Sequence, residues 1–246
     1  MITSLENKEI KKYAKLKQKK YRDFDKMFLV EGEHLVREAE KENLLWKVIV
    51  IEEDAYEFEP KLVVTEEIMK KLSTLETPPN IIGVCKMIEE KQELGNKVLV
   101  LDDIQDPGNL GTIIRSAVAF SASSIILSNH SADLYHPKVV RATQGMLFHT
   151  NIVRKDLASE ILRLKEAGYF IYTTDVEGGE EIKNIPLQEK QKIALVMGNE
   201  GNGVRDTIKL LADKKVYIKM NPLVESLNVG VATSILLYEM ENKKEK

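Results

Sequence analysis

The sequence predicts an α/β protein whose C-terminal part is a mostly parallel sheet and whose N-terminal part is a smaller α/β domain. Short, continuous apolar runs recur along the chain, and such runs are typical of strands buried on both faces. Stretches with the 3.6-residue period of amphipathic helices lie between them. At 246 residues, with 43% hydrophobic and 30% charged residues, the chain is long enough for two globular domains.

The first predicted domain covers residues 1–92. It begins with a basic amphipathic helix over residues 8–22, in which Ile10, Tyr13 and Leu16 share one face. Apolar runs then predict strands at 28–30, 48–51, 62–64 and 81–85, and helical periods predict helices at 33–41 and 66–72. The polar segment 89–96 ends in Gly-Asn and marks the domain boundary.

The second predicted domain covers residues 97–246, where strand and helix patterns alternate. Apolar runs predict strands at 98–101, 125–127, 170–172, 193–197 and 216–218. Helical periods predict helices at 110–120, 157–167, 204–211 and 229–240. This alternation favours a mostly parallel sheet with helices packed on it.

Basic residues are concentrated near the N-terminus. Nine basic and three acidic residues lie between Lys8 and Lys26, although the whole chain has a net charge of −3. A local excess of positive charge is what a phosphate-binding surface needs. The candidate contacts are Lys12, Lys15, Lys19, Lys20 and Arg22. A lysine-rich helix that is merely solvated remains an equal alternative.

Other classes of protein lack support in the sequence. No apolar run reaches the ~18 residues that span a bilayer, and the N-terminus has no apolar secretory core. We therefore expect a cytoplasmic protein. Cys85 is the single cysteine, and the four histidines lack the spacing of a metal motif, so we expect no metal site.

Three segments of the second domain combine glycine, asparagine and a charged residue just after a predicted strand. They cover residues 102–115, 197–203 and 225–232. Open α/β sheets bind ligands at the carboxyl ends of their strands. Taken singly, each segment fits an ordinary capped helix or structural loop. The glycine spacing in 197–203 matches neither a Walker A loop nor a dinucleotide fingerprint.

In combination these segments resemble a known family. The runs D-P-G-N-x-G-x-I-x-R, M-G-x-E-G-x-G and S-L-N-V-x-V-A occur in this order between Val98 and Glu239. They are similar to the three motifs of the SpoU/TrmH family of RNA ribose 2′-O-methyltransferases, within the SPOUT superfamily. The resemblance implies a trefoil knot in the C-terminal domain, S-adenosylmethionine as cofactor, and a homodimer. It also implies a ribosomal-protein-like N-terminal domain that binds RNA.

The resemblance also implies roles for individual residues. The implied catalytic residues are Asn109, Arg115, Glu200 and Asn228. The implied cofactor contacts are Thr173, Thr174, Met197, Gly198, Gly203, Ile218, Met220 and Leu227. The N-terminal lysines and Arg22 would bind RNA. One residue departs from the pattern, because Gly230 stands where the family usually has serine.

The implied substrate is 23S ribosomal RNA, because the N-terminal segment is similar to that of rRNA-modifying members. A tRNA methyltransferase and a catalytically silent RNA-binding protein of the same fold are the alternatives. An unrelated nucleotide- or phosphate-binding enzyme would have to use the 198–203 loop, which no P-loop lysine accompanies.

Overall fold

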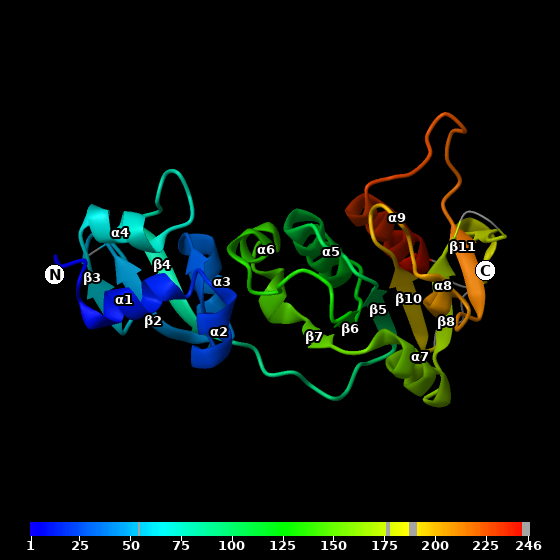
Figure 1. Cartoon of the computed structure of the whole chain (residues 1–246), viewed down its shortest axis with the longest axis horizontal. Helices are drawn as coiled ribbons and strands as arrows, with labels where there is room; N and C mark the ends of the chain where they lie inside the picture. The colour runs from blue at the N-terminus through cyan, green and yellow to red at the C-terminus, as the bar shows by residue number, and fades with distance from the viewer. Residues whose placement is uncertain (54, 176–177, 187–190, 243–246) are drawn as a thin grey trace. The chain divides into compact units, whose positions relative to one another are not determined.

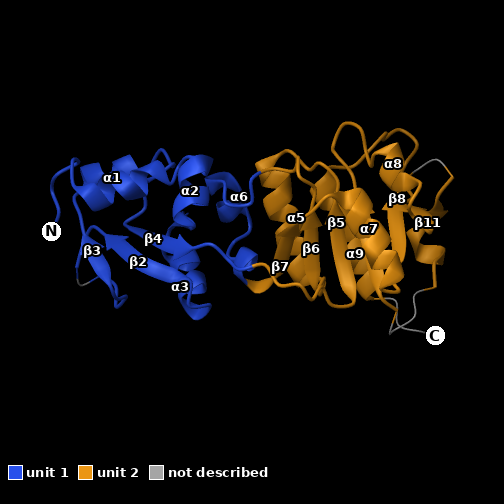
Figure 2. Cartoon of the chain, turned by 60° about the horizontal axis from the view of Figure 1, so that its bottom comes forward, with its two compact units in different colours: residues 1–89, 133–148 blue, residues 90–132, 149–246 orange. Residues whose placement is uncertain are grey.

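The structure is a computed structural model that describes residues 1–53, 55–175, 178–186 and 191–242. The chain forms two compact units (Figure 2). Unit 1 comprises residues 1–89 and 133–148, and unit 2 comprises residues 90–132 and 149–246. The first change of unit lies in the polar segment 89–96. The return of 133–148 to unit 1 was not anticipated, because it depends on contacts between residues far apart in the sequence.

Unit 1 is built on a four-stranded sheet in the order β1-β4-β2-β3. The strands are β1 Met27–Glu31, β2 Leu45–Val50, β3 Lys61–Val63 and β4 Ile81–Lys86. β4 runs antiparallel to β1 and β2, while β3 runs parallel to β2. The helices are α1 Lys8–Lys15, α2 Lys19–Asp25, α3 Glu33–Lys41, α4 Glu66–Leu72 and α6 Pro137–Ala142. The 3-10 helix η1 Met146–His149 ends the segment 133–148, and its last residue already belongs to unit 2. Ile10, Tyr13 and Leu16 are buried in the core of unit 1, as their shared face predicts.

The prediction of one helix over residues 8–22 is wrong, because the structure breaks it into α1 and α2. Gln18 adopts an extended conformation at the break. The carbonyl oxygens of Leu16 and Lys17, which no longer accept helical hydrogen bonds, accept from the Arg22 guanidinium at 2.7 and 2.8 Å. Arg22 also forms an ion pair with Asp133 and is only 2% exposed. This arginine stabilises the break and is not available to RNA, contrary to the prediction.

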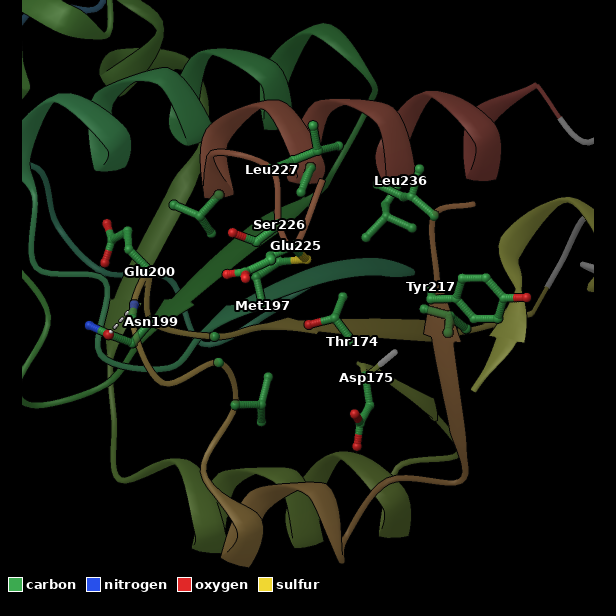
Figure 3. Close-up of a pocket in the computed structure, with 18 of the residues that line it drawn as sticks. Thr174, Asp175, Met197, Asn199, Glu200, Tyr217, Glu225, Ser226, Leu227 and Leu236 are labelled. Carbon is green, nitrogen blue, oxygen red and sulfur yellow. Dashed lines mark hydrogen bonds between the residues drawn. The ribbon is translucent and has the colours of Figure 1, made fainter. Parts of the chain in front are cut away.

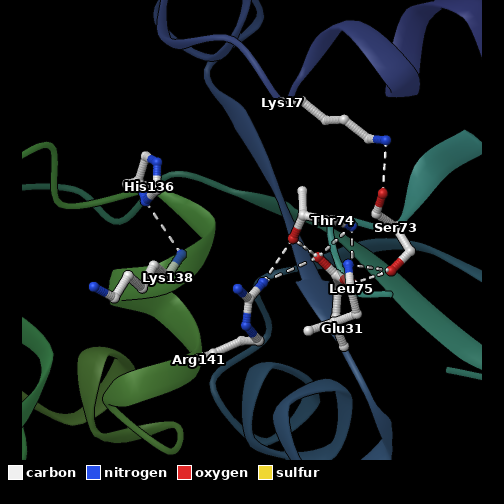
Figure 4. A network of polar contacts seen from close by, with 8 residues as sticks. All are labelled: Lys17, Glu31, Ser73, Thr74, Leu75, His136, Lys138 and Arg141. Carbon is white, nitrogen blue, oxygen red and sulfur yellow. Dashed lines mark hydrogen bonds and ion pairs between the residues drawn. The ribbon is translucent and has the colours of Figure 1, made fainter. Parts of the chain in front are cut away.

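Segment 133–148 is held in unit 1 by polar contacts (Figure 4). The buried carboxylate of Glu31 accepts hydrogen bonds from the hydroxyls of Ser73 and Thr74, both at 2.5 Å. Arg141, in α6, donates to Glu31 at 3.4 Å and to the Thr74 hydroxyl at 2.6 Å. A buried carboxylate needs such partners, so α6 is part of the stable structure of unit 1.

Unit 2 contains the predicted parallel sheet, with seven strands in the order β7-β6-β5-β10-β8-β11-β9. The strands are β5 Lys97–Leu101, β6 Ser124–Leu127, β7 Asn151–Arg154, β8 Phe170–Thr174, β9 Glu180–Glu181, β10 Ile193–Met197 and β11 Lys214–Tyr217. All these pairings are parallel. The two strands that were not predicted, β7 and β9, lie at the sheet edges, where a long apolar run is not required.

Helices cover both faces of this sheet. α5 Pro107–Ala119 and α9 Val229–Glu241 lie side by side on one face, and α7 Leu157–Glu166 and α8 Asp206–Lys209 lie on the other (Figures 1 and 3). The 3-10 helix η2 spans Ile182–Asn184. The apolar runs of β5 and β10 are buried between the two helical layers, as their composition predicts. No helix in the described ranges is long and apolar enough to cross a membrane.

Candidate active site

A pocket of about 570 Å³ opens at the carboxyl ends of three neighbouring parallel strands in unit 2 (Figure 3). Thr174, Met197 and Tyr217 are the last residues of β8, β10 and β11, and all three line it. The remaining walls come from the glycine loop 198–203, the segment 218–227 and α9. Parallel α/β sheets bind ligands in this position, and the volume suits a small molecule.

The glycine loop is folded tightly on itself. Asn199 and Gly203 exchange backbone hydrogen bonds of 3.0 and 2.9 Å. A Cβ atom on Gly198 would lie 2.0 Å from the carbonyl carbon of Gly203, so no larger residue fits there. Gly203 itself has a φ of +67°, in the left-handed region that favours glycine. These two glycines therefore fix the loop that forms one wall of the pocket.

Two contacts attach this loop to the end of β5. The buried Asp102 carboxylate accepts from the backbone N–H of Arg205 at 2.9 Å and from its Nε at 2.8 Å. The hydrogen bond to Asp102 also raises the pKa of Arg205, so the guanidinium of Arg205 stays charged. Asn199 Nδ2 donates to the carbonyl of Asp103 at 2.9 Å. The loop is therefore fixed at both of its ends.

A chain of side-chain hydrogen bonds joins the three sequence motifs. Asn109 Nδ2 donates to Glu200 Oε1 at 2.9 Å, and Asn109 Oδ1 accepts from Asn228 Nδ2 at 2.9 Å. Asn228 is the N-cap of α9, and its Oδ1 accepts from the N–H groups of Gly230 and Val231. The motif residues therefore converge at the rim of the pocket, where Glu200 is part of the lining.

Arg115 is separate from this chain. It is exposed on α5, does not line the pocket, and forms no ion pair with the residues that the structure describes. A guanidinium in this state is free to meet a group from outside the unit.

Seven of the eight predicted cofactor contacts lie in the pocket wall. They are Thr174, Met197, Gly198, Gly203, Ile218, Met220 and Leu227. Thr173 does not line the pocket, contrary to the prediction. It is fully buried, because successive side chains of a strand point to opposite faces of the sheet. Its hydroxyl has no hydrogen-bond partner among the described residues.

Sequence analysis missed several pocket residues. Asp175 follows β8 and forms ion pairs with Lys215 at 2.8 Å and Lys209 at 3.6 Å. Glu225 and Ser226 line the opposite side of the pocket (Figure 3). The sequence held no motif for Asp175, although its place after a strand of the parallel sheet is the kind of position that contributes to ligand sites.

The glycine at position 230 has a packing explanation. A Cβ atom there would lie 3.1 Å from Cγ2 of Thr112 and 3.2 Å from Oδ1 of Asn228. One turn further along, the hydroxyls of Ser116 and Ser234 join α5 to α9 at 2.7 Å. A serine at 230 would therefore require Thr112 to move, and glycine permits this close approach of the two helices.

The predicted RNA-contacting lysines lie on unit 1. Lys12, Lys15, Lys19 and Lys20 are exposed on or next to α1 and α2, whereas Arg22 is buried. Lys12 and Lys19 form surface ion pairs with Asp25 at 3.1 Å and Asp23 at 2.6 Å. Exposed pairs of this kind contribute only about 0–1 kcal/mol and are screened by salt, so a phosphate can compete for these lysines.

Residues 96–238 match the SpoU rRNA methylase family, and residues 7–83 match the MRM3-like substrate binding domain. The chain is 38% identical over 245 residues to the 23S rRNA (guanosine(2553)-2′-O)-methyltransferase RlmP of Bacillus subtilis, covering 97% of this chain and 98% of that protein.

Solved structures give the same result. The AdoMet-bound rRNA methyltransferase of Sinorhizobium meliloti superposes with a TM-score of 0.86 and 29% identity, covering 97% of this chain and 96% of that one. The SpoU methyltransferase AviRb of Streptomyces viridochromogenes, in complex with AdoMet, gives a TM-score of 0.82 and 25% identity, covering 96% and 97%. These matches extend over both units of the chain.

Proposed function

We propose, since this chain belongs to the SpoU rRNA methylase family, that it transfers a methyl group from S-adenosylmethionine to a ribose 2′-hydroxyl of 23S ribosomal RNA. The observation that carries the proposal is the hydrogen-bonded chain Glu200–Asn109–Asn228 beside the strand-end pocket. The guanosine named for the Bacillus relative is the first nucleotide to examine.

The pocket residues fit this cofactor. Apolar side chains such as Ile218 and Leu227 suit the adenine ring, and the backbone of the glycine loop is open to polar groups. Three carboxylates, those of Asp175, Glu200 and Glu225, also line the pocket and suit a cationic ligand. S-adenosylmethionine carries a sulfonium cation and supplies an activated methyl group.

We assign the remaining chemistry to the motif residues. Asn109 and Asn228 hold the loops and the attacking hydroxyl in line with the methyl group, and alignment lowers the barrier by several kcal/mol. Glu200 braces the glycine loop through Asn109. Arg115 binds the target phosphate and stabilises the developing alkoxide as a fixed positive charge. The hydroxyl proton passes to water or to a phosphate oxygen.

The position of Arg115 outside the pocket supports a homodimer in which a second copy supplies this arginine. Exposed apolar side chains in unit 2 support the same arrangement, because a partner would cover them. They are Leu223, Val224, Val231 and Tyr238. We also propose that the segment from β10 to α9 forms the trefoil knot that the family resemblance implies. The central place of β10 between β5 and β8, and the return of α9 onto α5, support it.

The lysines of α1 and α2 would hold the RNA by its phosphates, with affinity that falls as salt rises. A ribosomal RNA substrate supports the cytoplasmic location that the sequence predicts.

The test is methyl transfer from radiolabelled S-adenosylmethionine to RNA from cells that lack this gene. Methylated positions are mapped by their resistance to alkaline hydrolysis, because a 2′-O-methyl group removes the attacking hydroxyl. We expect one new site in 23S ribosomal RNA. Arg115→Ala serves as the inactive control that should still bind cofactor.

Two other outcomes would support the alternative functions. Methyl transfer to tRNA, with none to ribosomal RNA, would show that the protein is a tRNA methyltransferase. A protein that binds RNA but gives no calorimetric signal with S-adenosylmethionine at millimolar concentration would be a silent RNA-binding protein.

A further inference from the structure

The surface formed by α1 and α2 contains more than positive charge. Lys8, Lys11, Lys12 and Lys15 recur at the spacing i, i+3, i+4 and i+7, so they form one stripe along α1. This stripe lies opposite the buried face that carries Ile10 and Tyr13. It forms one wall of a groove of about 570 Å³ between the two helices.

The other wall is formed by Lys20, Tyr21, Phe24 and Asp25 of α2, and the Asp25 carboxylate pairs with Lys12 across the groove at 3.1 Å. The ammonium groups of Lys20 and Lys15 lie 4.7 and 5.4 Å from the centre of the Tyr21 ring. Cations at this distance are attracted to the ring. Tyr21 therefore holds two of the lysines in place beside the groove.

Phe24 differs from every other phenylalanine of the described chain, because it alone is strongly exposed, at 84%. Within the ranges that the structure describes, no other aromatic ring and no cation packs against it. Its ring borders a groove whose lining also contains five lysines and one aspartate. An apolar protein surface would have to bury those ammonium groups, which is costly. A nucleotide offers a flat base to the ring and a phosphate to the lysines.

We propose that the groove between α1 and α2 binds an unpaired nucleotide, whose base stacks on Phe24 while its flanking phosphates contact the lysines. A base inside a duplex is already stacked on both sides and cannot offer a face, so the groove selects loops, bulges or ends. This inference deepens the proposed function, on which its choice of RNA rests. It assigns to unit 1 the recognition of a single-stranded feature of the substrate RNA.

The test compares two probes in the full-length protein: a labelled hairpin RNA with a pyrimidine-rich loop, and a fully paired duplex of the same length. Phe24→Ala should weaken hairpin binding by about 5- to 100-fold, the effect of removing one stacking platform. Duplex binding should stay within about twofold, because no phosphate contact is lost. The salt dependence of hairpin binding should also be unchanged, since no charge is removed.

Two further substitutions separate stacking from simple apolar contact. Phe24→Trp should keep the affinity for the hairpin. When Trp46, the single tryptophan, is also replaced by phenylalanine, the fluorescence of the tryptophan at position 24 should fall as the hairpin binds. Phe24→Leu keeps an apolar side chain without a ring and should bind the hairpin as weakly as Phe24→Ala. Leu75→Ala, at another partly exposed apolar residue of unit 1, is the matched control and should have no effect.

Several results would overturn the inference. Equal losses for hairpin and duplex, or wild-type hairpin binding by Phe24→Leu, would exclude stacking. A change in oligomeric state on Phe24→Ala, measured by light scattering, would show that a second copy of the chain covers the ring. All these experiments measure RNA binding in the absence of cofactor, so their results do not depend on methyl transfer. A protein that selects the hairpin through Phe24 but transfers no methyl group would refute the proposed activity and would still support the stacking site.

Discussion

The pocket loops of unit 2 and the α1–α2 surface of unit 1 hold their polar side chains in opposite ways. Around the pocket, Asp102, Asn109 and Asn228 are committed to partners within the unit, so their effect depends on position. On α1 and α2 the lysines are exposed and their ion pairs are weak, so their effect depends on charge. A substitution near the pocket should therefore change turnover or stability strongly, whatever the salt concentration. A substitution on the α1–α2 surface should change RNA affinity only slightly, and the change should depend on salt.

The largest expected effect is on turnover and comes from Arg115, which is exposed on unit 2 but is proposed to act on the same reaction as the pocket residues. Arg115→Ala should lower turnover by about 10²- to 10³-fold, as for loss of one preorganised donor. Cofactor affinity measured by calorimetry should not change, because Arg115 does not line the pocket. Arg37→Ala, at an exposed arginine paired with Glu33, is the matched control. Near-normal turnover of Arg115→Ala would remove this residue from the mechanism.

A carboxylate placed in the hydrogen-bonded chain should be the next most severe change. In the unsubstituted protein, Asn109 Nδ2 donates a hydrogen bond to Glu200. Asn109→Asp replaces this donor with a carboxylate, so that two negative charges face each other. We expect about 10- to 100-fold lower turnover at alkaline pH, the effect of losing a charge-assisted hydrogen bond.

The turnover of Asn109→Asp should depend on pH. When two carboxylates lie side by side, the pKa of one of them is raised. Below that pKa the protonated carboxyl can donate as the amide does, so the variant should regain activity as pH falls. Asn202→Asp adds a carboxylate to the same exposed loop outside this bond and is the control. A loss that does not depend on pH would argue against the assigned hydrogen bond.

Loss of the contact between Asp102 and Arg205 should lower mainly the free energy of unfolding. Asp102→Asn removes the buried charge that Arg205 faces and should lower the free energy of unfolding by about 2 kcal/mol. For a unit of this size, calorimetry should show a fall in Tm of roughly 4–8 °C. Asp103→Asn should have no such cost, because its φ of +59° suits asparagine and the bond from Ser128 can persist. Equal Tm values for both variants would contradict the role of Asp102.

The smallest effect belongs to single lysines of unit 1. Lys15→Gln should weaken RNA binding only a few-fold and reduce the slope of log affinity against log salt by about one. Lys41→Gln, on α3, should leave the slope unchanged. An unchanged slope in both variants would show that Lys15 is a bystander.

The sequence predicted the sheet, its helices and the convergence of the three motifs, because buried parallel strands and capped helix starts leave strong local patterns. It failed where long-range contacts decide. Arg22 looked like one more basic surface residue, but Asp133 and the carbonyls at the helix break bury it. Thr173 and Thr174 could not be separated until the register of β8 was known. Phe24 followed no motif, and its exposure became visible only in the folded unit.

The return of residues 133–148 to unit 1 has a practical consequence for dissecting this protein. A fragment that stops at residue 89 would lose Asp133 and Arg141, and would leave the buried charges of Arg22 and Glu31 without their ionic partners. Breaking a buried pair in this way costs about 3–5 kcal/mol, a large part of the stability of a small domain. Unit 1 therefore cannot be prepared simply as a fragment that ends at residue 89. A working version must carry the discontinuous segment, joined by a designed connection.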